Sequence, residues 1–256
     1  MAMTHKADPK DSPRTTIILA LVTLAVGLYA IAYGLQTTFY FQAHSWAMRT
    51  PFLRETLQPL PSTAASPVET KNISFYGMNF SAPWKGIASQ KSQDAQSSVT
   101  FTSGPIIVVF DPQTEADPLE TIRDGDPNLY SRYQQVFGHD LFPSTYDLYA
   151  AVYGASPALL SPVMPRDKMD RVAALLQWKL NFGSDGGTAI YSVDAAGMRG
   201  IQLGDPSRDH IVTVRLFDSR NHQYRMLFTS TKGPGTYPQA DINCVLDSLA
   251  PAPPRE

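Results

Sequence analysis

Residues 137–154, FGHDLFPSTYDLYAAVYG, hold the densest group of side chains that could carry out chemistry. His139 and Asp140 are adjacent, and Ser144 lies five residues after the histidine, so a base, an acid and a hydroxyl occur in one short segment. Hydrolases activate a serine nucleophile through such a neighbouring base. However, the GxSxG sequence of a nucleophile elbow is missing. Ser144 is also followed three residues later by Asp147, which is typical of a helix N-cap.

The histidines do not form a metal-binding pattern. The 5 histidines include no pair at i and i+4, and no HExxH sequence is present. The segment GDPSRDH brings Asp205, Asp209 and His210 together in sequence, but a complete ligand set would have to come from distant segments. Cys244 is the single cysteine, which excludes both a CxxC metal knuckle and an intramolecular disulfide. We therefore predict no metal site and no cofactor.

Two further polar segments favour turns over phosphate or acid–base sites. The glycine-rich SDGGT, residues 184–188, follows a predicted helix and precedes a strand, which reverses the order of a phosphate-binding loop. Asp124 and Asp126 flank a glycine without a partner carboxylate at a defined distance. Aspartate and glycine are common in turns. We predict no catalytic residue, and an envelope hydrolase that uses loop His, Asp and Ser groups remains the alternative.

Seven aromatic residues form the candidate binding surface. They lie in a stretch predicted to be mostly helical, and they are Tyr130, Tyr133, Phe137, Phe142, Tyr146, Tyr149 and Tyr153. Two trios in this set repeat the i, i+3, i+7 spacing of one helix face. Such stripes often pack in a core, but tyrosine keeps its hydroxyl near water or a partner. Two interpretations stay open: core packing, or a partly exposed groove that binds a partner protein, a glycan or the membrane surface.

The N-terminal part of the chain contains a long apolar run. Residues 15–41, TTIILALVTLAVGLYAIAYGLQTTFYF, carry no charged side chain. This run exceeds the ~20 residues that a helix needs to cross ~30 Å of hydrocarbon. Its second half is rich in Tyr and Phe, as at a membrane interface. The apolar core of a cleaved signal peptide would be shorter, about 7–15 residues. We therefore predict an uncleaved transmembrane anchor.

The basic residues around the apolar run favour one orientation. Lys6, Lys10 and Arg14 precede the run, whereas Arg49 and Arg54 follow it. Positive charge accumulates on the cytoplasmic side of membrane proteins. Because the large folded part follows the run, we predict a single-pass protein of the inner or plasma membrane. Its N-terminus is in the cytoplasm and its C-terminal domain is extracytoplasmic.

The chain divides into predicted parts by composition. The sequence TLQPLPSTAASPVET, residues 56–70, is rich in proline and serine and indicates a spacer. The predicted parts are a cytoplasmic tail (1–14), the transmembrane anchor (15–41), a juxtamembrane helix and linker (42–71), an extracytoplasmic α+β domain (72–250) with a helical insert (128–182), and a C-terminal tail (251–256).

The hydrophobic patterning of the domain predicts its fold class. Strand patterns occur near both ends of the domain, and helical patterns occupy its middle. The segment HIVTVRLFD places Val212, Val214 and Leu216 on one apolar face, which predicts an antiparallel sheet with one buried side. A last helix is predicted from about residue 237 to 249. The fold class is therefore α+β: an antiparallel β-sheet packed with helices, preceded by one N-terminal transmembrane helix.

Both ends of the domain resemble a known fold. ISFYGMNFSAPWKG, which begins at Ile73, resembles the opening strand pair of the PsbP/Mog1-like α/β sandwich. YRMLFTSTKGPGTYPQADINCVLDSLA, which begins at Tyr224, resembles its last strand, loop and helix. The likeness covers residues 72–110 and 188–250. It implies a binding or assembly role without catalysis, and it carries over no catalytic residue.

Charge excludes one class of partner. The formal net charge is −2 and no run of Lys and Arg occurs, which argues against nucleic-acid binding through phosphate neutralisation. We predict a membrane-anchored, extracytoplasmic binding or interaction domain, with an envelope protein or a glycan as its partner. A role without catalysis is favoured, and the oligomeric state is left open.

Overall fold

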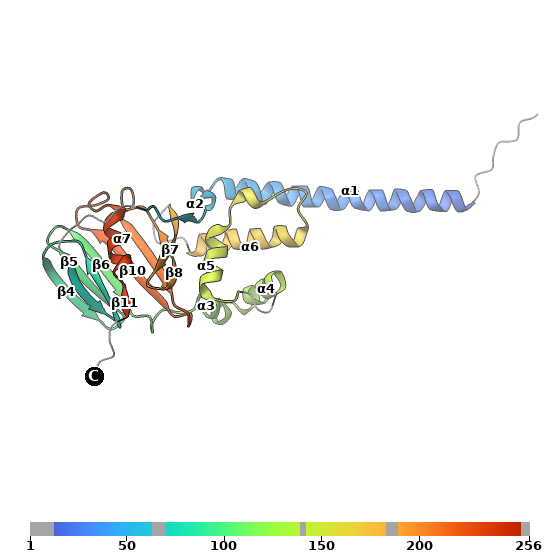
Figure 1. The fold of residues 1–256 in the computed structure, drawn as a ribbon. Coiled ribbons are helices and arrows are strands. Elements are labelled where there is room, and N and C mark those ends of the chain that lie inside the picture. The colour runs from blue at the N-terminus through green and yellow to red at the C-terminus, as the bar shows by residue number, and fades with distance from the viewer. Residues whose placement is uncertain (1–12, 63–69, 139–141, 183–188, 252–256) are drawn as a thin grey trace, which may run out of the picture.

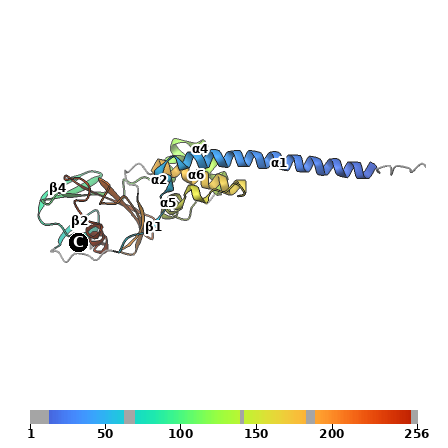
Figure 2. The same cartoon turned by 90° about the horizontal axis from the view of Figure 1, so that it is seen from above.

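One long helix leads into a folded domain. The computed structural model describes residues 13–62, 70–138, 142–182 and 189–251. Helix α1, Pro13–Met48, is 36 residues long and projects far from the domain (Figures 1 and 2). Within the described residues it is the one helix that is long and apolar enough to cross a membrane. It includes the predicted span and continues beyond it without a break.

Eight strands form one mixed sheet in the order β1-β7-β8-β9-β10-β6-β5-β4. Neighbouring strands are antiparallel except for the parallel pair of β1 and β7. The strands are β1 (Gln58–Pro59), β4 (Ile87–Gln93), β5 (Gln96–Phe101), β6 (Pro105–Phe110), β7 (Ile190–Ala195), β8 (Met198–Leu203), β9 (Ile211–Phe217) and β10 (Gln223–Ser230). With the helices described below, this sheet confirms the predicted α+β class.

One face of the large sheet carries the main apolar core. Helix α7 (Gln239–Asp247) and a three-stranded sheet pack with it; that sheet has the order β11-β3-β2. Its strands are β2 (Lys71–Phe75), β3 (Met78–Ala82) and β11 (Ala250–Pro251). Val212, Val214 and Leu216 of β9 are fully buried here, as their alternation predicts.

The opposite face of the sheet is covered by the helical part of the chain. Its elements are α3 (Pro118–Gly125), α4 (Pro127–Phe137), α5 (Thr145–Gly154), the 3-10 helix η1 (Pro157–Leu159) and α6 (Arg166–Phe182). Helix α5 contacts the sheet directly, where its Tyr149 and Tyr153 pack on Ile201 and Leu203 of β8. Helices α4 and α6 pack on α5 around Trp178, farther from the sheet.

The prediction that only one side of the sheet is buried is wrong at β9. Thr213 and Arg215, on the polar face of this strand, are buried together with Phe217. The reason is that residues 118–182 fold back over this face, which the alternation in the strand itself does not encode. A polar strand face therefore became an interior surface.

The C-terminal part of α1 belongs to the folded domain. Tyr40, Ala43 and Ala47 pack against Met169 and Leu176 of α6, and Figure 1 shows α6 alongside this part of α1. A short helix α2 (Pro51–Arg54) and strand β1 follow, and β1 pairs with β7. Part of the predicted juxtamembrane segment is thus packed on the domain. Residues 63–69 lie outside the described residues.

Candidate functional site

The seven aromatic residues of the predicted binding surface point into two packed clusters. Tyr133, Tyr149 and Tyr153 are buried. Tyr149 and Tyr153 stack with ring centroids 5.9 Å apart against the sheet. These rings present little surface to a partner, so the three side chains mainly support the fold. Their packing contributes to the stability of the helical part.

The second cluster surrounds Trp178, which is fully buried. The ring of Tyr133 meets the indole edge-on, with ring centroids 4.3 Å apart. The ring centroids of Phe137 and Phe142 lie 5.9 and 6.0 Å from that of the indole. Four of the seven residues are half-buried, namely Tyr130, Phe137, Phe142 and Tyr146. A binding role for these four stays a prediction.

Ser144 is the N-cap of α5, as its spacing predicts. Its hydroxyl accepts a hydrogen bond from the backbone N–H of Asp147 at 3.1 Å and donates to the Asp147 carboxylate at 2.6 Å. These two bonds occupy the hydroxyl with helix capping. His139 and Asp140 lie outside the described residues. The pairing of Ser144 with His139 that the hydrolase alternative needs therefore stays a prediction.

A polar cleft of 490 Å³ lies beside this helix start. Arg199 stacks over the ring of Tyr146 with its guanidinium carbon 4.3 Å from the ring centroid. Asp218 accepts a 2.9 Å hydrogen bond from the ring of His222. Partial burial would raise the pKa of the Asp218 carboxyl. The bonds from His222 and Arg220 outweigh this effect, so its pKa lies below the ordinary value.

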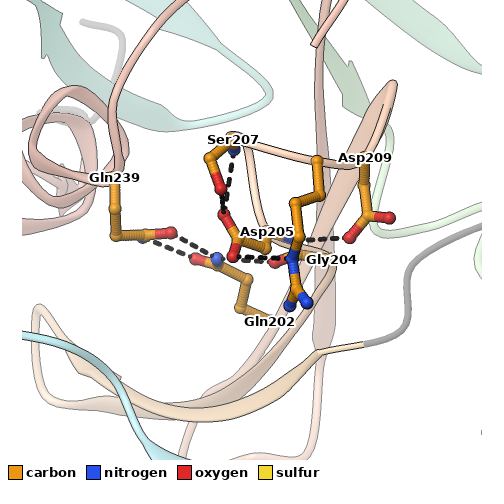
Figure 3. Close-up of polar contacts among 7 residues, drawn as sticks. Gln202, Gly204, Asp205, Ser207, Asp209 and Gln239 are labelled. Atoms are coloured by element: carbon orange, nitrogen blue, oxygen red, sulfur yellow. Dashed lines mark hydrogen bonds and ion pairs between the residues drawn. The ribbon is translucent and has the colours of Figure 1, made fainter. Parts of the chain in front are cut away.

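The candidate metal segment forms a loop in which both aspartates accept hydrogen bonds from neighbouring residues of the loop (Figure 3). Asp205 accepts bonds from the hydroxyl and the backbone N–H of Ser207, and Asp209 accepts one from the backbone N–H of Asp205. Burial would raise the pKa of Asp205, but the bonds from Ser207 and the nearby Arg208 hold it below its usual value. Across the described residues, no group of three or more His, Cys, Asp or Glu side chains is placed to hold a metal ion. The backbone carbonyl of His210 accepts a hydrogen bond from the hydroxyl of Thr229 at 2.8 Å.

The remaining sequence candidates have structural roles. Asp126 caps α4 by accepting a bond from the N–H of Leu129 at 3.0 Å, while Asp124 pairs with Arg123 in the exposed last turn of α3. Burial, followed by the nearby carboxylates, raises the pKa of the half-buried Cys244 thiol. A raised thiol pKa disfavours the reactive thiolate. The segment 184–188 lies outside the described residues.

A buried ionic group lies on two neighbouring strands of the sheet, β9 and β10. Glu115 lies between Arg215, at 3.7 Å, and Arg225, at 2.9 Å, and it also accepts a 2.8 Å hydrogen bond from Gln223. The side chain of Glu115 is only 10% exposed. Sequence alternation identifies Arg215 as a surface residue, so this group was missed. The group has a structural role, because the Glu115 carboxylate is enclosed by its partners.

A second buried charge connects three segments. Lys179 of α6 is fully buried, and its ammonium group donates to the carbonyls of Glu55, Tyr153 and Ala155. Burial lowers the pKa of Lys179 to about 8, a shift that the nearby Glu55 only partly offsets. Two of these carbonyls end α5 and one follows α2. The lysine therefore connects the segment after α2 to the helical part.

A groove of 670 Å³ lies between α1, α4 and α6, and we call it the anchor groove. Its apolar lining combines the three helices and is formed by Phe39, Ala43, Trp46, Leu129, Tyr133, Val136, Ala173, Ala174 and Leu180. Its polar lining consists of Arg132, Asp170, Gln177 and Asn181. Trp46 is 44% exposed there. Of the predicted binding residues, only Tyr133 lines this groove, with a buried side chain.

Sequence reasoning missed the anchor groove because its walls are far apart in the chain. One signal was present: Phe39, Ala43 and Trp46 are spaced at i, i+4, i+7 just where the apolar run ends. That spacing marks one helix face, but it does not identify the helices that face it.

Comparison of the chain with protein-family models, with curated protein sequences and with solved structures gives no match. The resemblance to the PsbP/Mog1-like sandwich therefore stays a prediction. What the protein does must be argued from the arrangement of its own residues.

Proposed function

We propose that this chain is a single-pass, membrane-anchored extracytoplasmic binding protein. Its anchor groove receives an apolar helix of a partner protein that runs beside α1. The proposal keeps the binding role inferred from the sequence, but it moves the contact from the tyrosine stripes to the groove. The observation that carries it is an open, mostly apolar groove built partly by the anchor helix itself.

The position of the groove favours a partner that shares the membrane. Phe39, Ala43 and Trp46 continue the face of α1 that Leu28 and Ala32 present at earlier turns of the same helix. These earlier residues are exposed, as expected for side chains that meet lipid or another membrane helix. A partner helix that follows this face out of the bilayer would enter the groove. This is helix-in-groove recognition, in which anchors at helical spacing fill an apolar channel.

The polar lining favours a protein helix over a lipid chain. Arg132, Asp170, Gln177 and Asn181 supply two charges and two amides along the groove. A peptide helix carries side chains that can pair with such groups. A saturated acyl chain has no hydrogen-bonding atoms and would leave these groups without a gain in binding energy.

Orientation is part of the proposal. The basic residues before the apolar run and the large folded part that follows it support a cytoplasmic N-terminus. A C-terminal alkaline phosphatase fusion should be active, because that enzyme works only outside the cytoplasm of bacteria. An inactive fusion, together with an active cytoplasmic reporter at the same position, would reject this orientation.

Photo-crosslinking tests the groove. We would place p-benzoylphenylalanine at Trp46, inside the groove, and at Met48, which is 43% exposed but does not line it. The two sites lie on the same helix with nearly equal exposure, so they differ mainly in the face they occupy. In native membranes we expect a discrete protein adduct from position 46 only.

A variant that fills the groove completes the test. Ala173→Trp should abolish the adduct from position 46 while leaving the circular dichroism spectrum and thermal unfolding unchanged. Adducts to lipid alone would contradict a protein partner. Equal adducts from positions 46 and 48 would contradict the groove as the contact.

A further inference from the structure

We infer that the loop between η1 and α6, residues 160–165, is a second membrane contact that rests on the bilayer surface beside α1. Its partner is the boundary between lipid headgroups and acyl chains. The inference goes beyond the proposed binding role and rests on α1 being embedded in the membrane.

Hydrogen bonds fix the position of the loop along α1. The side-chain amide of Gln36 donates to the carbonyl of Pro162 at 3.2 Å and to the carbonyl of Met164. Gln36 lies inside the apolar run predicted to span the membrane, residues 15–41. The loop therefore sits beside the anchor at a defined turn, not at the end of a tether.

That turn coincides with the expected edge of the hydrocarbon. The stretch 15–35 has about 21 residues, which at ~1.5 Å per residue gives ~31 Å, close to the ~30 Å hydrocarbon thickness. Non-helical backbone exposed to lipid does not occur within the hydrocarbon, because its N–H and C=O groups would lack partners. The hydrocarbon must then end near Gln36, several residues before Phe41. The loop is consequently placed at the interface.

The tip of the loop is apolar and open. Val163 is 76% exposed, the highest value among the large hydrophobic side chains of the described residues. Pro162 and Pro165 flank the tip and restrict its backbone. Exposure to water does not stabilise an apolar side chain, whereas its transfer into the acyl boundary of a bilayer has a favourable free energy.

Basic residues follow the tip at once. Arg166 and Lys168 lie in the first turn of α6 and are exposed, and Arg171 lies one turn further. Asp167 and Asp170 accompany them, so the three cations exceed the two carboxylates. An excess of positive charge next to an apolar tip favours a surface that carries anionic lipid headgroups. Together with α1, this contact would set the direction in which the anchor groove opens.

Site-directed spin labelling tests the contact in the full chain. Cys244→Ser removes the native thiol, and Val163→Cys then carries a nitroxide at the tip. Lys91→Cys in the exposed strand β4 serves as the aqueous control, and Leu28→Cys in α1 as the hydrocarbon control. The labelled proteins are reconstituted in vesicles of phosphatidylcholine with a minority of phosphatidylglycerol. Collision rates with oxygen and with a water-soluble nickel chelate report the depth of each label.

The oxygen-to-nickel collision ratio at position 163 should be several-fold above that at position 91 and below that at position 28. A ratio at position 163 equal to that at position 91, with position 28 buried in lipid, overturns this inference alone. If position 28 is as aqueous as position 91, α1 does not span the membrane and the proposed anchoring fails as well. The two failures are therefore distinguishable.

Discussion

Gln36 and Pro162 are hydrogen-bonded over 3.2 Å although they are 126 positions apart in the chain. The donor belongs to the long apolar helix α1, and the acceptor belongs to a loop of the folded domain. The buried Ala47 and the partly buried Tyr40, on later turns of α1, pack against α6. Helix α1 and the domain are therefore joined by side-chain packing and by polar contacts.

Gln36→Leu should loosen the 160–165 loop. The change removes the donor to the Pro162 and Met164 carbonyls, each bond being worth about 1 kcal/mol. We expect faster amide hydrogen exchange in the peptide that covers residues 160–165. Thr37→Val is the matched control, because the Thr37 hydroxyl bonds only within α1, to the carbonyl of Tyr33. Equal exchange in both variants would show that Gln36 does not hold the loop.

Lys179 should make the free energy of unfolding depend on pH in the alkaline range. The folded chain releases this proton near pH 8, whereas an unfolded chain holds it up to about pH 10.5. Between these values the unfolded state binds more protons, so the free energy of unfolding rises with pH. We expect a gain on the order of a few kcal/mol relative to Lys179→Met, measured by urea unfolding in detergent micelles. Parallel pH profiles for the two proteins would contradict the burial of this ammonium group.

Glu115→Gln should destabilise the domain strongly. The substitution keeps the shape but leaves Arg215 and Arg225 without the carboxylate between them, and breaking a buried pair costs about 3–5 kcal/mol. Glu120→Gln is the control, since Glu120 pairs with Arg123 in the open and an exposed pair contributes about 0–1 kcal/mol. Urea midpoints followed by far-ultraviolet circular dichroism distinguish the two. Similar losses in both variants would mean that the Glu115 group is not a stabilising interior contact.

Substitution of a buried aromatic residue should destabilise the protein more than substitution of a half-buried one. Tyr153 is fully buried and its hydroxyl donates to the Phe182 carbonyl at 3.1 Å, so Tyr153→Phe should cost about 1 kcal/mol and Tyr153→Ala about 3–5 kcal/mol. Tyr130 is half-buried, so Tyr130→Ala should cost less. Thermal unfolding measures both. A larger loss for Tyr130→Ala would reverse the assignment of these two side chains.

Local features of the chain were predictable because they depend on neighbours in sequence. The apolar run predicts α1, and alternation predicts β9 and its fully buried face. Ser144 caps α5 as its spacing to Asp147 predicts, because a cap is made within one turn. Strand β4 was not predicted, since all of its side chains are exposed and leave no hydrophobic alternation.

The candidate site was decided by tertiary structure. Helical spacing shows that Tyr146, Tyr149 and Tyr153 share a stripe, but only the sheet that packs on α5 determines that two of them are buried. The same holds for Arg215, which alternation places on a polar face and the helices enclose with Glu115. Hydrophobic run length, side-chain periodicity and capping act over a few residues, so they were enough to predict the apolar helix α1, the apolar face of β9 and the cap of α5. Only the folded chain decided the groove, the buried charges and the level of the 160–165 loop, because burial depends on which distant segment arrives to exclude water.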